Sequence, residues 1–225
     1  ALCKALSLGA DLVTHSSTKG DGGHSTAGAG VIIGEASFIK KFRASVQCVR
    51  PVLDPRAAVD MMIGLEDLDE RMERHSTNAL LLATMLAKHS LVDNVFYAYL
   101  PNHPEHALAK QQMKGGGPLF SFTLLHRSHL PLLRENICKP ATLEESQRFI
   151  NMLTKSGPVL LAVHIAHETT LATHPASTSH AKMPKPDREE IGLTDNMIRV
   201  SVGSESPRGF AKVMKQFAKT FKAWE

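Results

Sequence analysis

The chain has 225 residues, of which 43% are hydrophobic, 21% charged and 5% aromatic. This length allows one large domain or two small ones with a sizeable core, and the composition is that of a globular protein. The formal net charge is +4, but the basic residues are scattered and few aromatic residues accompany them. These features exclude an extended nucleic-acid-binding surface from the expected functions.

The cysteines are few and well separated. Cys3, Cys48 and Cys138 form no CxxC pair, and their odd number predicts free thiols in a reducing compartment. No apolar run is long enough to span a bilayer and no signal peptide is evident, so we expect a cytoplasmic protein without a membrane partner. The chain starts with ALCKALSLGADLV and no initiator methionine, which indicates a truncated N-terminus.

Two short strands flank a glycine-rich loop at the start of the chain. LGADLVTHSS predicts a short buried strand, and AGAGVIIG, at residues 27–34, predicts a second strand bounded by glycines. Pro51 and Pro55 then mark a linker before a helical region.

The helical region shows apolar residues at alternating spacings of three and four, which predicts one stripe of a long helix. The stripe consists of Leu65, Leu68, Met72, His75, Ala79, Leu82 and Leu86. A charged run surrounds its first turns, where acidic side chains are favourable. The run comprises Glu66, Asp67, Asp69, Glu70, Arg71, Glu73 and Arg74, and its simplest interpretation is a solvated face.

The rest of the chain alternates strands and helices. NVFYAYLP predicts a strand ending at Pro101, LFSFTLL predicts a strand at 119–125, and PVLLAVHIA predicts a buried strand. Residues 126–147 hold several histidines and prolines and predict an irregular surface insertion. MIRVSVG alternates as a half-buried strand does, and an α/β fold follows.

The C-terminal segment predicts an amphipathic helix. Its apolar face carries Phe210, Val213, Met214, Phe217 and Phe221, and the opposite face carries Lys212, Lys215, Lys219 and Lys222.

Lys19 follows a run of hydroxyl side chains, Ser16, Ser17 and Thr18, and precedes the glycine-rich loop. The segment has neither the GxxxxGK[ST] order of a P-loop nor the order of a dinucleotide fingerprint, because the lysine precedes the glycines. Two interpretations remain: a surface lysine in a glycine turn, or a lysine that forms a Schiff base while Ser16 and Thr18 donate to a cofactor phosphate.

Arg199 lies in the middle of the MIRVSVG strand, between apolar residues that face the other way. Its guanidinium either reaches solvent or points into a cavity to bind a carboxylate as a fork. The residue pattern leaves both open.

The twelve histidines raise the question of a metal site. His103 and His106 are three residues apart, as are His164 and His167, but these segments predict loops or strands rather than a helix. No acidic or cysteine ligand completes either set, so we predict no metal site.

Five segments occur in an informative order: GADLVTHSSTK, RMERHSTNALLLATMLAKH, LPNHPEHALAKQQMKGGGPLFSF, TLATHPASTSHAKMP and IGLTDNMIRVSVGSES. Together they resemble the Cys/Met-metabolism enzymes that depend on pyridoxal phosphate, a family that includes cystathionine gamma-lyase, cystathionine gamma-synthase, cystathionine beta-lyase and methionine gamma-lyase. The resemblance covers most of the chain, with a gap over the insertion.

The resemblance implies a role for each candidate residue. Lys19 matches the lysine that holds the cofactor as a Schiff base, and Ser16 and Thr18 match the hydroxyls that contact the cofactor phosphate. Arg199 matches the arginine that binds the substrate α-carboxylate. The expected reaction is γ-elimination from methionine or cystathionine, with Lys19 acting as the base at the α-proton. A cystathionine gamma-synthase, an acylhomoserine sulfhydrylase and a non-catalytic fragment or degenerate paralogue are the alternatives.

The resemblance also implies domains and assembly. Residues 1–64 are expected to be the C-terminal remainder of a large cofactor-binding domain of the pyridoxal-phosphate transferase type. Residues 65–225 are expected to form a linking helix and a smaller α/β domain. The full-length protein would be a homotetramer or homodimer.

The chain departs from the family at two places. Gly20 and Asp21 replace the aromatic residue that usually follows the lysine. His164, Ile165 and Ala166 replace a serine–leucine–glycine run that lines the substrate site, so a reshaped pocket is expected. The family's aspartate partner of the pyridine nitrogen and its ring-stacking tyrosine would lie upstream of Ala1.

Overall fold

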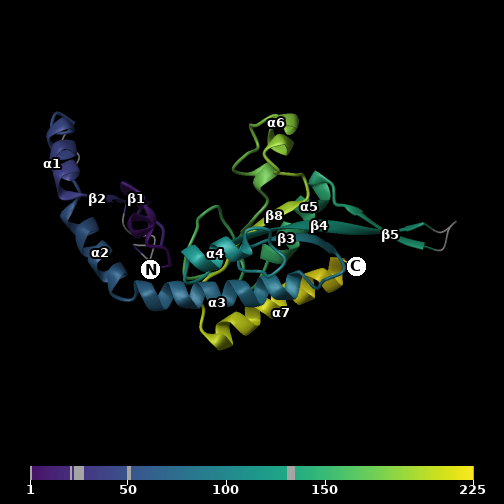
Figure 1. The fold of residues 1–225 in the computed structure, drawn as a ribbon. Helices are drawn as coiled ribbons and strands as arrows, with labels where there is room; N and C mark the ends of the chain where they lie inside the picture. The colour runs from purple at the N-terminus through teal and green to yellow at the C-terminus, as the bar shows by residue number, and fades with distance from the viewer. Residues whose placement is uncertain (1, 21, 23–27, 50–51, 131–134, 225) are drawn as a thin grey trace.

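The computed structural model describes residues 2–20, 22, 28–49, 52–130 and 135–224, and the side chains at 127–130 and 135–137 are outside that description. Figure 1 shows an α/β fold in which a long helix, α3, connects a group of N-terminal elements to a larger body built on a sheet. The α/β class predicted from the alternation of strands and helices is confirmed.

The N-terminal elements are built on a two-stranded antiparallel sheet. Strand β1 pairs with β2 from Leu12↔Gly34 to Ser16↔Gly30, so both expected strands are present. The expectation that the first strand is buried is wrong, since only Val13 of β1 is even half-buried. In the described part of the chain β1 has no sheet neighbour other than β2. These elements are η1 (Ala5–Leu8), β1 (Leu12–Ser16), β2 (Gly30–Gly34) and α1 (Ala36–Ser45).

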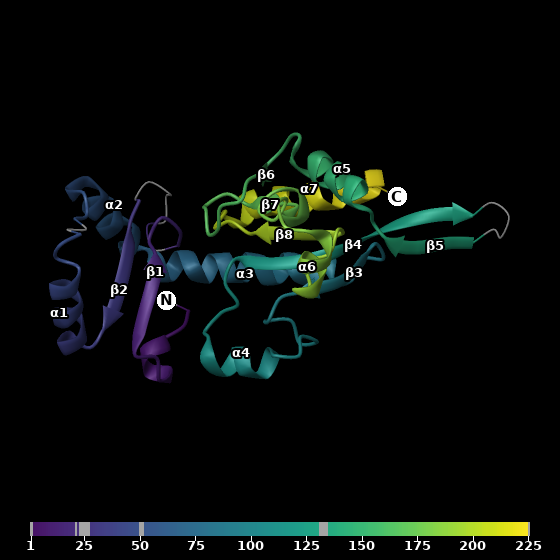
Figure 2. The ribbon, with the colours of Figure 1, turned by 90° about the horizontal axis from the view of Figure 1, so that it is seen from above.

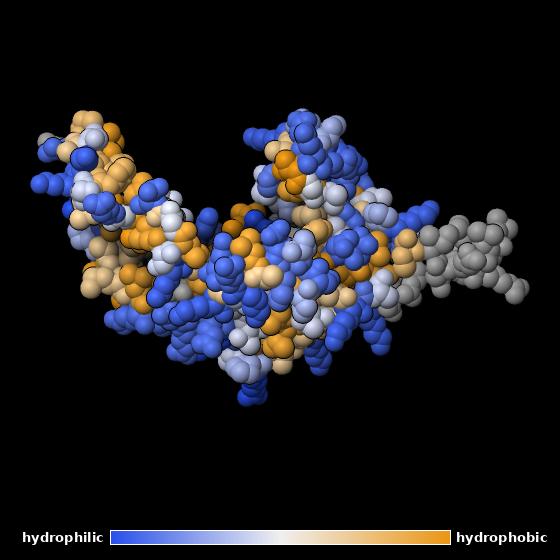
Figure 3. Space-filling view, in the orientation of Figure 1, coloured by the Kyte–Doolittle hydropathy of each residue, from blue (hydrophilic) through white to orange (hydrophobic). Residues whose placement is uncertain are grey.

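Exposed apolar side chains gather on the elements that precede α3, visible as orange patches over α1 and its surroundings in Figure 3. They include Ile32, Ile33, Phe38, Val49, Val52, Val59, Met62 and Ile63, each more than 40% exposed. The apolar core of the described residues therefore lies elsewhere, on the sheet of the larger body.

The expected long helix is two helices. Helix α2 (Pro55–Glu66) begins at a proline, and the Asp54 carboxylate caps it by accepting hydrogen bonds from the Arg56 and Ala57 amides at 2.9 and 3.2 Å. The chain breaks at Asp67, and α3 (Leu68–Leu86) follows. Leu65 therefore belongs to α2 and is exposed, whereas the later stripe residues Met72, His75, Ala79, Leu82 and Leu86 are buried as predicted.

The main sheet has the strand order β3-β4-β8-β7-β6, and β5 also pairs with β4 (Figure 2). Only the β6–β7 pair is parallel among the pairs described. The strands are β3 (Val92–Phe96), β4 (Leu119–Leu130), β5 (Glu135–Pro140), β6 (Leu160–Leu161), β7 (Leu171–Thr173) and β8 (Met197–Ser201).

The described residues within 126–147 do not form an irregular insertion. Strand β4 continues to Leu130 and pairs with β5 from Leu125↔Pro140 to Leu130↔Glu135, forming an arm that extends from the body in Figure 2. Helix α5 (Leu143–Thr154) then starts with a capping box between Thr142 and Glu145. The ladder of backbone hydrogen bonds makes this segment regular despite its prolines and histidines.

Two other expected strands are shorter than the sequence suggests. The NVFYAYLP strand ends at Phe96 rather than Pro101. In PVLLAVHIA only Leu160 and Leu161 are in strand, and both are about half exposed at 48% and 52%, so this segment is not a buried strand.

Aromatic side chains from β4, α5 and α7 (Pro207–Trp224) form the centre of the core. The ring of Phe149 lies 4.9 Å from Phe221 and 6.3 Å from Phe122, and all three side chains are at most 1% exposed. The apolar face predicted for the C-terminal helix is confirmed, with Met214 half-buried and the four lysines exposed. The remaining short helices are α4 (His106–Gln112), η2 (Pro175–Ser177) and α6 (Lys185–Glu190).

Cys3, Cys48 and Cys138 are free and exposed, as the sequence predicted. Among the described residues, no helix combines the length and apolar character needed to span a bilayer.

Candidate active site

Lys19 lies in a hydrogen-bonded turn that follows β1. The Lys19 amide donates to the Ser16 carbonyl at 3.0 Å, and the Ser17 amide donates to the Ala29 carbonyl at 2.9 Å. The Lys19 side chain is exposed, and its ammonium has no hydrogen-bond or ion-pair partner within the described residues. Backbone bonds therefore define the turn and leave the amine available to a ligand.

The hydroxyl side chains beside Lys19 also lack partners in the part of the chain that the structure describes. Ser17 Oγ is fully buried and makes no hydrogen bond to any described residue, although a buried hydroxyl normally finds a partner. Ser16 is exposed and Thr18 half-buried, and neither hydroxyl bonds to another described group. Three hydroxyls and an ammonium that are unpaired within the described ranges form a donor set that fits a phosphorylated ligand.

Arg71, on α3, holds this turn from the other side. Its Nη1 donates to the Gly20 carbonyl at 2.8 Å, Nη2 donates to the Gly64 carbonyl, and Nε donates to Asp67 Oδ1 at 3.1 Å. Arg71 is only 4% exposed. The interpretation of the charged run as a solvated face is therefore wrong for Arg71, because its guanidinium satisfies acceptors inside the fold, and right for the other six residues.

Arg199 lies on β8 with its side chain half-buried. Its neighbours Ile198 and Val200 are 0% exposed on the opposite face, which confirms the predicted alternation. Arg199 Nη2 donates to the Val163 carbonyl at 2.7 Å, and burial lowers the pKa of the guanidinium from its ordinary value. The side chain is thus directed at the loop 163–166, and its remaining N–H groups have no acceptor among the described residues.

The same loop contacts the lysine turn. A Cβ added at Gly20 would lie 3.7 Å from Ala166 Cβ and 3.6 Å from Met72 Cε, so the backbone after Lys19 packs against both. Ala166 is held by its amide, which donates to Ser201 Oγ at 2.9 Å. The structure therefore brings Lys19 and Arg199 to one loop, although the described contacts include none between their side chains.

The departures expected from the sequence fall at this loop. His164 is exposed and Ile165 is half-buried, whereas Ala166 is buried with φ of 58°. A left-handed alanine is strained, and a glycine would adopt this conformation without penalty. The other departure is at Gly20 and Asp21. The structure describes only Gly20 there, because Asp21 lies outside the described residues.

Two polar side chains lie one and two turns further along α3: His75, which the sequence analysis placed in the helix stripe without a polar role, and Asn78, which it did not name. His75 Nδ1 donates to the Val202 carbonyl at 2.7 Å, and Asn78 Nδ2 donates to the Gly203 and Glu205 carbonyls at 3.1 Å each. Arg71, His75 and Asn78 follow the i, i+4, i+7 spacing of a helix face, within an otherwise apolar stripe. That spacing was the signal that could have identified them.

His75 is a neutral buried histidine. Desolvation by burial lowers its pKa to about 4, and the Arg71 charge acts in the same direction, while the hydrogen bond to Val202 and the charge of Glu168 oppose the shift. Its Nε2 has no partner among the described residues.

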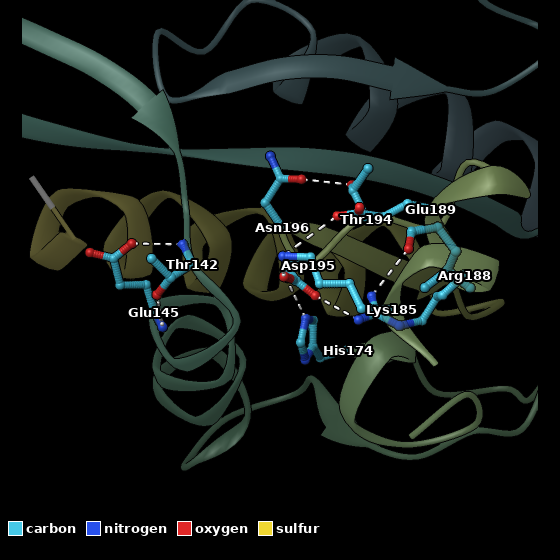
Figure 4. Close-up of polar contacts among 10 residues, drawn as sticks. Thr142, Glu145, His174, Lys185, Arg188, Glu189, Thr194, Asp195 and Asn196 are labelled. Carbon is cyan, nitrogen blue, oxygen red and sulfur yellow. Dashed lines mark hydrogen bonds and ion pairs between the residues drawn. The ribbon is translucent and has the colours of Figure 1, made fainter. Parts of the chain in front are cut away.

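The described pockets lie beside, not at, the predicted residues. One pocket of about 430 Å³ lies on the far side of Arg71 and is lined by Asp67, Glu70, Arg71, Arg74, Glu168, Thr169, Ser204 and Glu205. A larger groove of about 920 Å³ is lined partly by a polar network around Asp195, shown in Figure 4. Neither is lined by Lys19 or Arg199. Within the described residues no cluster of three histidine, cysteine or acidic side chains could hold a metal.

Solved structures share this fold. A cystathionine gamma synthase from Xanthomonas oryzae pv. oryzae, solved in complex with cystathionine, superimposes with a TM-score of 0.83 and 30% identity over 100% of this chain and 54% of that one. A cystathionine gamma-lyase from Lactobacillus plantarum gives a TM-score of 0.79 at 28% identity. This chain therefore shares its fold with two enzymes whose names refer to cystathionine.

The family itself follows from the sequence match. The profile described as "Cys/Met metabolism PLP-dependent enzyme" matches residues 1–217, and the chain belongs to that family of pyridoxal-phosphate-dependent enzymes. It is 34% identical over 205 residues to an O-succinylhomoserine sulfhydrylase from Pseudomonas aeruginosa and 35% identical over 205 residues to an L-methionine gamma-lyase from Fusobacterium nucleatum subsp. polymorphum. These alignments cover 91% and 90% of this chain but 46% and 47% of the relatives, so the chain spans about half their length.

Proposed function

We propose that this chain carries the cofactor lysine of a pyridoxal-phosphate-dependent carbon–sulfur lyase, and that Lys19 binds the cofactor covalently. The observation that carries the proposal is the set of donors at Ser16, Ser17, Thr18 and Lys19 that have no side-chain partner among the described residues, in a turn packed against the loop that Arg199 contacts. Bound pyridoxal phosphate supplies an electron sink for the pair released at the substrate α-carbon.

Side chains of this chain bind the phosphate, transfer the proton and bind the substrate carboxylate. Ser16 and Thr18 donate hydrogen bonds to the phosphate, and Lys19 Nζ accepts the proton released from the substrate α-carbon. Arg199 binds the α-carboxylate with its free N–H groups while Nη2 stays on the Val163 carbonyl, which orients the substrate.

The reaction that we favour is γ-elimination from methionine or cystathionine, with a cystathionine gamma-synthase or acylhomoserine sulfhydrylase as the alternative. Both kinds of activity occur among relatives of nearly equal identity, at 35% for the gamma-lyase and 34% for the sulfhydrylase. Release of 2-oxobutyrate from methionine or cystathionine supports the lyase, whereas consumption of an acylhomoserine together with a thiol supports the transferase.

A non-catalytic role is the second candidate. Its support is His164, which stands where the family has a small hydroxyl, together with Gly20 and Asp21, which replace the aromatic residue that usually follows the lysine. We also propose a domain boundary between residues 64 and 65, assembly of the full-length protein as a homodimer or homotetramer, and a cytoplasmic location.

Borohydride reduction with pyridoxal phosphate, followed by peptide mapping, tests the proposed function. We expect one pyridoxyl group per chain, on Lys19, and none in Lys19→Ala. Lys40→Ala removes an exposed lysine on α1 and serves as the matched control, with labelling of Lys19 unchanged. Labelling spread over many surface lysines, or its persistence in Lys19→Ala, would contradict the assignment.

A further inference from the structure

Among the described residues, Arg71 is the side chain from outside the lysine turn that forms a hydrogen bond with it. This contact suggests that Arg71 helps to position the lysine for the reaction. We infer that Arg71 is a positioning residue for Lys19, which fixes the backbone after the lysine relative to the loop held by Arg199. The inference rests on the proposed function of Lys19.

Two hydrogen bonds bracket Lys19. On one side its own amide donates to the Ser16 carbonyl at 3.0 Å, and on the other the carbonyl of the next residue, Gly20, accepts from Arg71 Nη1 at 2.8 Å. Peptide units are planar, so two fixed units leave few backbone torsions between them. The Cα–Cβ direction of Lys19 is therefore set by Arg71 together with β1.

The bond to Gly20 crosses the fold. Arg71 and Gly20 are 51 residues apart, and the same guanidinium also reaches the Gly64 carbonyl near the end of α2 and Asp67 between α2 and α3. Met72, next to Arg71, packs against Gly20 on the side where Ala166 also lies. The lysine turn, the α2–α3 junction and the loop near Arg199 are thus held in one arrangement by a single side chain and its neighbour.

Arginine suits this task better than lysine. A guanidinium presents five donors in a rigid plane, and here it serves two carbonyls and one carboxylate while only 4% exposed. A lysine side chain ends in one compact ammonium group, which cannot reach these three separated acceptors at the same time. Asp67 supplies the counter-charge that makes burial of the cation tolerable.

Arg71→Ala with chemical rescue tests the inference on the chain in complex with pyridoxal phosphate. The rate of borohydride-trapped labelling at Lys19 should fall by about ten-fold, because misplacing a reacting group by a small distance is costly. Added guanidinium ion should restore most of the rate, and methylammonium at equal ionic strength should not. The pH midpoint of the absorbance of lysine-bound cofactor should move in Arg71→Ala and return with guanidinium.

Arg74→Ala is the matched control. Arg74 lies on the same helix and pairs with Glu70 four residues earlier, as Arg71 pairs with Asp67, but it is exposed and does not contact the turn. Its labelling rate and pH midpoint should equal those of the unchanged chain. An effect of the same size in both variants would mean that helix charge, rather than the bond to Gly20, is responsible, and would overturn the inference.

The outcomes separate this inference from the proposed function. Absence of Lys19 labelling in the unchanged chain defeats the proposed function and the inference with it. Labelling of the unchanged chain and of a folded Arg71→Ala variant at the same rate defeats only the inference. If Arg71→Ala does not fold, the Arg71→Lys variant provides the test. Slower labelling of Lys19 in Arg71→Lys supports the inference. An unchanged labelling rate together with an unchanged pH midpoint overturns it.

Discussion

Arg188 and Asp195 form an ion pair, with 2.7 Å between Nη2 and Oδ1, in which the arginine side chain is only 5% exposed (Figure 4). The other carboxylate oxygen accepts from Lys185 Nζ at 2.6 Å, and the lysine side chain is 58% exposed. Burial alone would raise the pKa of Asp195, but the hydrogen bonds from the two cations outweigh it and hold the pKa below its ordinary value. The Asp195 carboxylate thus pairs with one buried cation, Arg188, and with one exposed cation, Lys185.

The two cations should contribute very differently to stability. Asp195→Ala leaves the Arg188 charge buried without a carboxylate partner, although Nη1 still donates to the Leu193 carbonyl, and should lower the free energy of unfolding by about 3 kcal/mol. Lys185→Ala removes an exposed partner and should lower it far less, because water and salt screen an exposed ion pair. Urea titrations at pH 7 measure both values, and losses of equal size would show that the burial of Arg188 has no energetic consequence.

Acid should destabilise the fold through His75. The folded-state pKa of about 4 lies below the ordinary value of 6.5, so the unfolded chain binds the proton first as the pH falls. This contribution to stability is complete above about pH 6.5 and decreases toward pH 4, by roughly 3 kcal/mol in total. Urea unfolding measured from pH 7.5 to 4 should show the decrease.

Replacement of His75 isolates this effect. His75→Asn keeps a donor for the Val202 carbonyl and removes the titrating ring, so the dependence on pH should flatten. His164→Asn changes an exposed histidine and should leave the dependence as it is. His174, whose pKa burial also lowers, contributes to the slope that remains. An identical slope in His75→Asn would assign acid sensitivity to other groups.

Ala166→Gly should stabilise the chain. Relief of the left-handed conformation at φ of 58° outweighs the extra freedom of glycine in the unfolded state, for a net gain of up to about 1 kcal/mol. Ala109→Gly, in the middle of α4, is the opposite control and should lose about 1 kcal/mol. Thermal melting of the two variants checks the signs, and a loss at residue 166 would contradict the prediction.

Arg199→Lys should separate substrate binding from cofactor binding. Lysine lacks the planar fork, so KM for the amino-acid substrate should rise by about ten-fold while borohydride labelling of Lys19 is unchanged. Arg208→Lys, at an exposed position on α7, should alter neither quantity. A lower labelling yield in Arg199→Lys would instead place Arg199 among the groups that organise the lysine turn.

The sequence predicted those parts of the fold in which one element determines its own burial. The apolar face of α7 and the alternation around Arg199 are visible locally, because a helix or strand against a core must repeat with its own period. The exposure of β1 and the β4–β5 ladder were not predictable in this way, since each depends on which segment lies alongside. Periodicity also cannot show that α2 and α3 are separate helices when apolar residues continue through the break at Asp67.

The residues of the candidate site also differ in this respect: some are recognisable from the local sequence, and others depend on contacts with distant segments. Lys19 and Arg199 were named from motifs, and the structure brings both to the loop 163–166, but their roles remain predictions. Arg71 was misassigned because a charged side chain in a charged run normally faces water, and only the distant Gly20 and Gly64 carbonyls give it a buried partner. Such contacts between segments far apart in the chain have no local signature.

The position of β8 in the sheet has a consequence for synthesis on the ribosome. Strands β4 and β7 do not pair with each other but with β8, which is translated after both, and α7, which completes the aromatic cluster, is translated later still. A nascent chain therefore holds β4 with one unpaired edge until Met197–Ser201 emerges. Native pairing must then form between distant segments, which predicts slow post-translational closure and a transient need for chaperones.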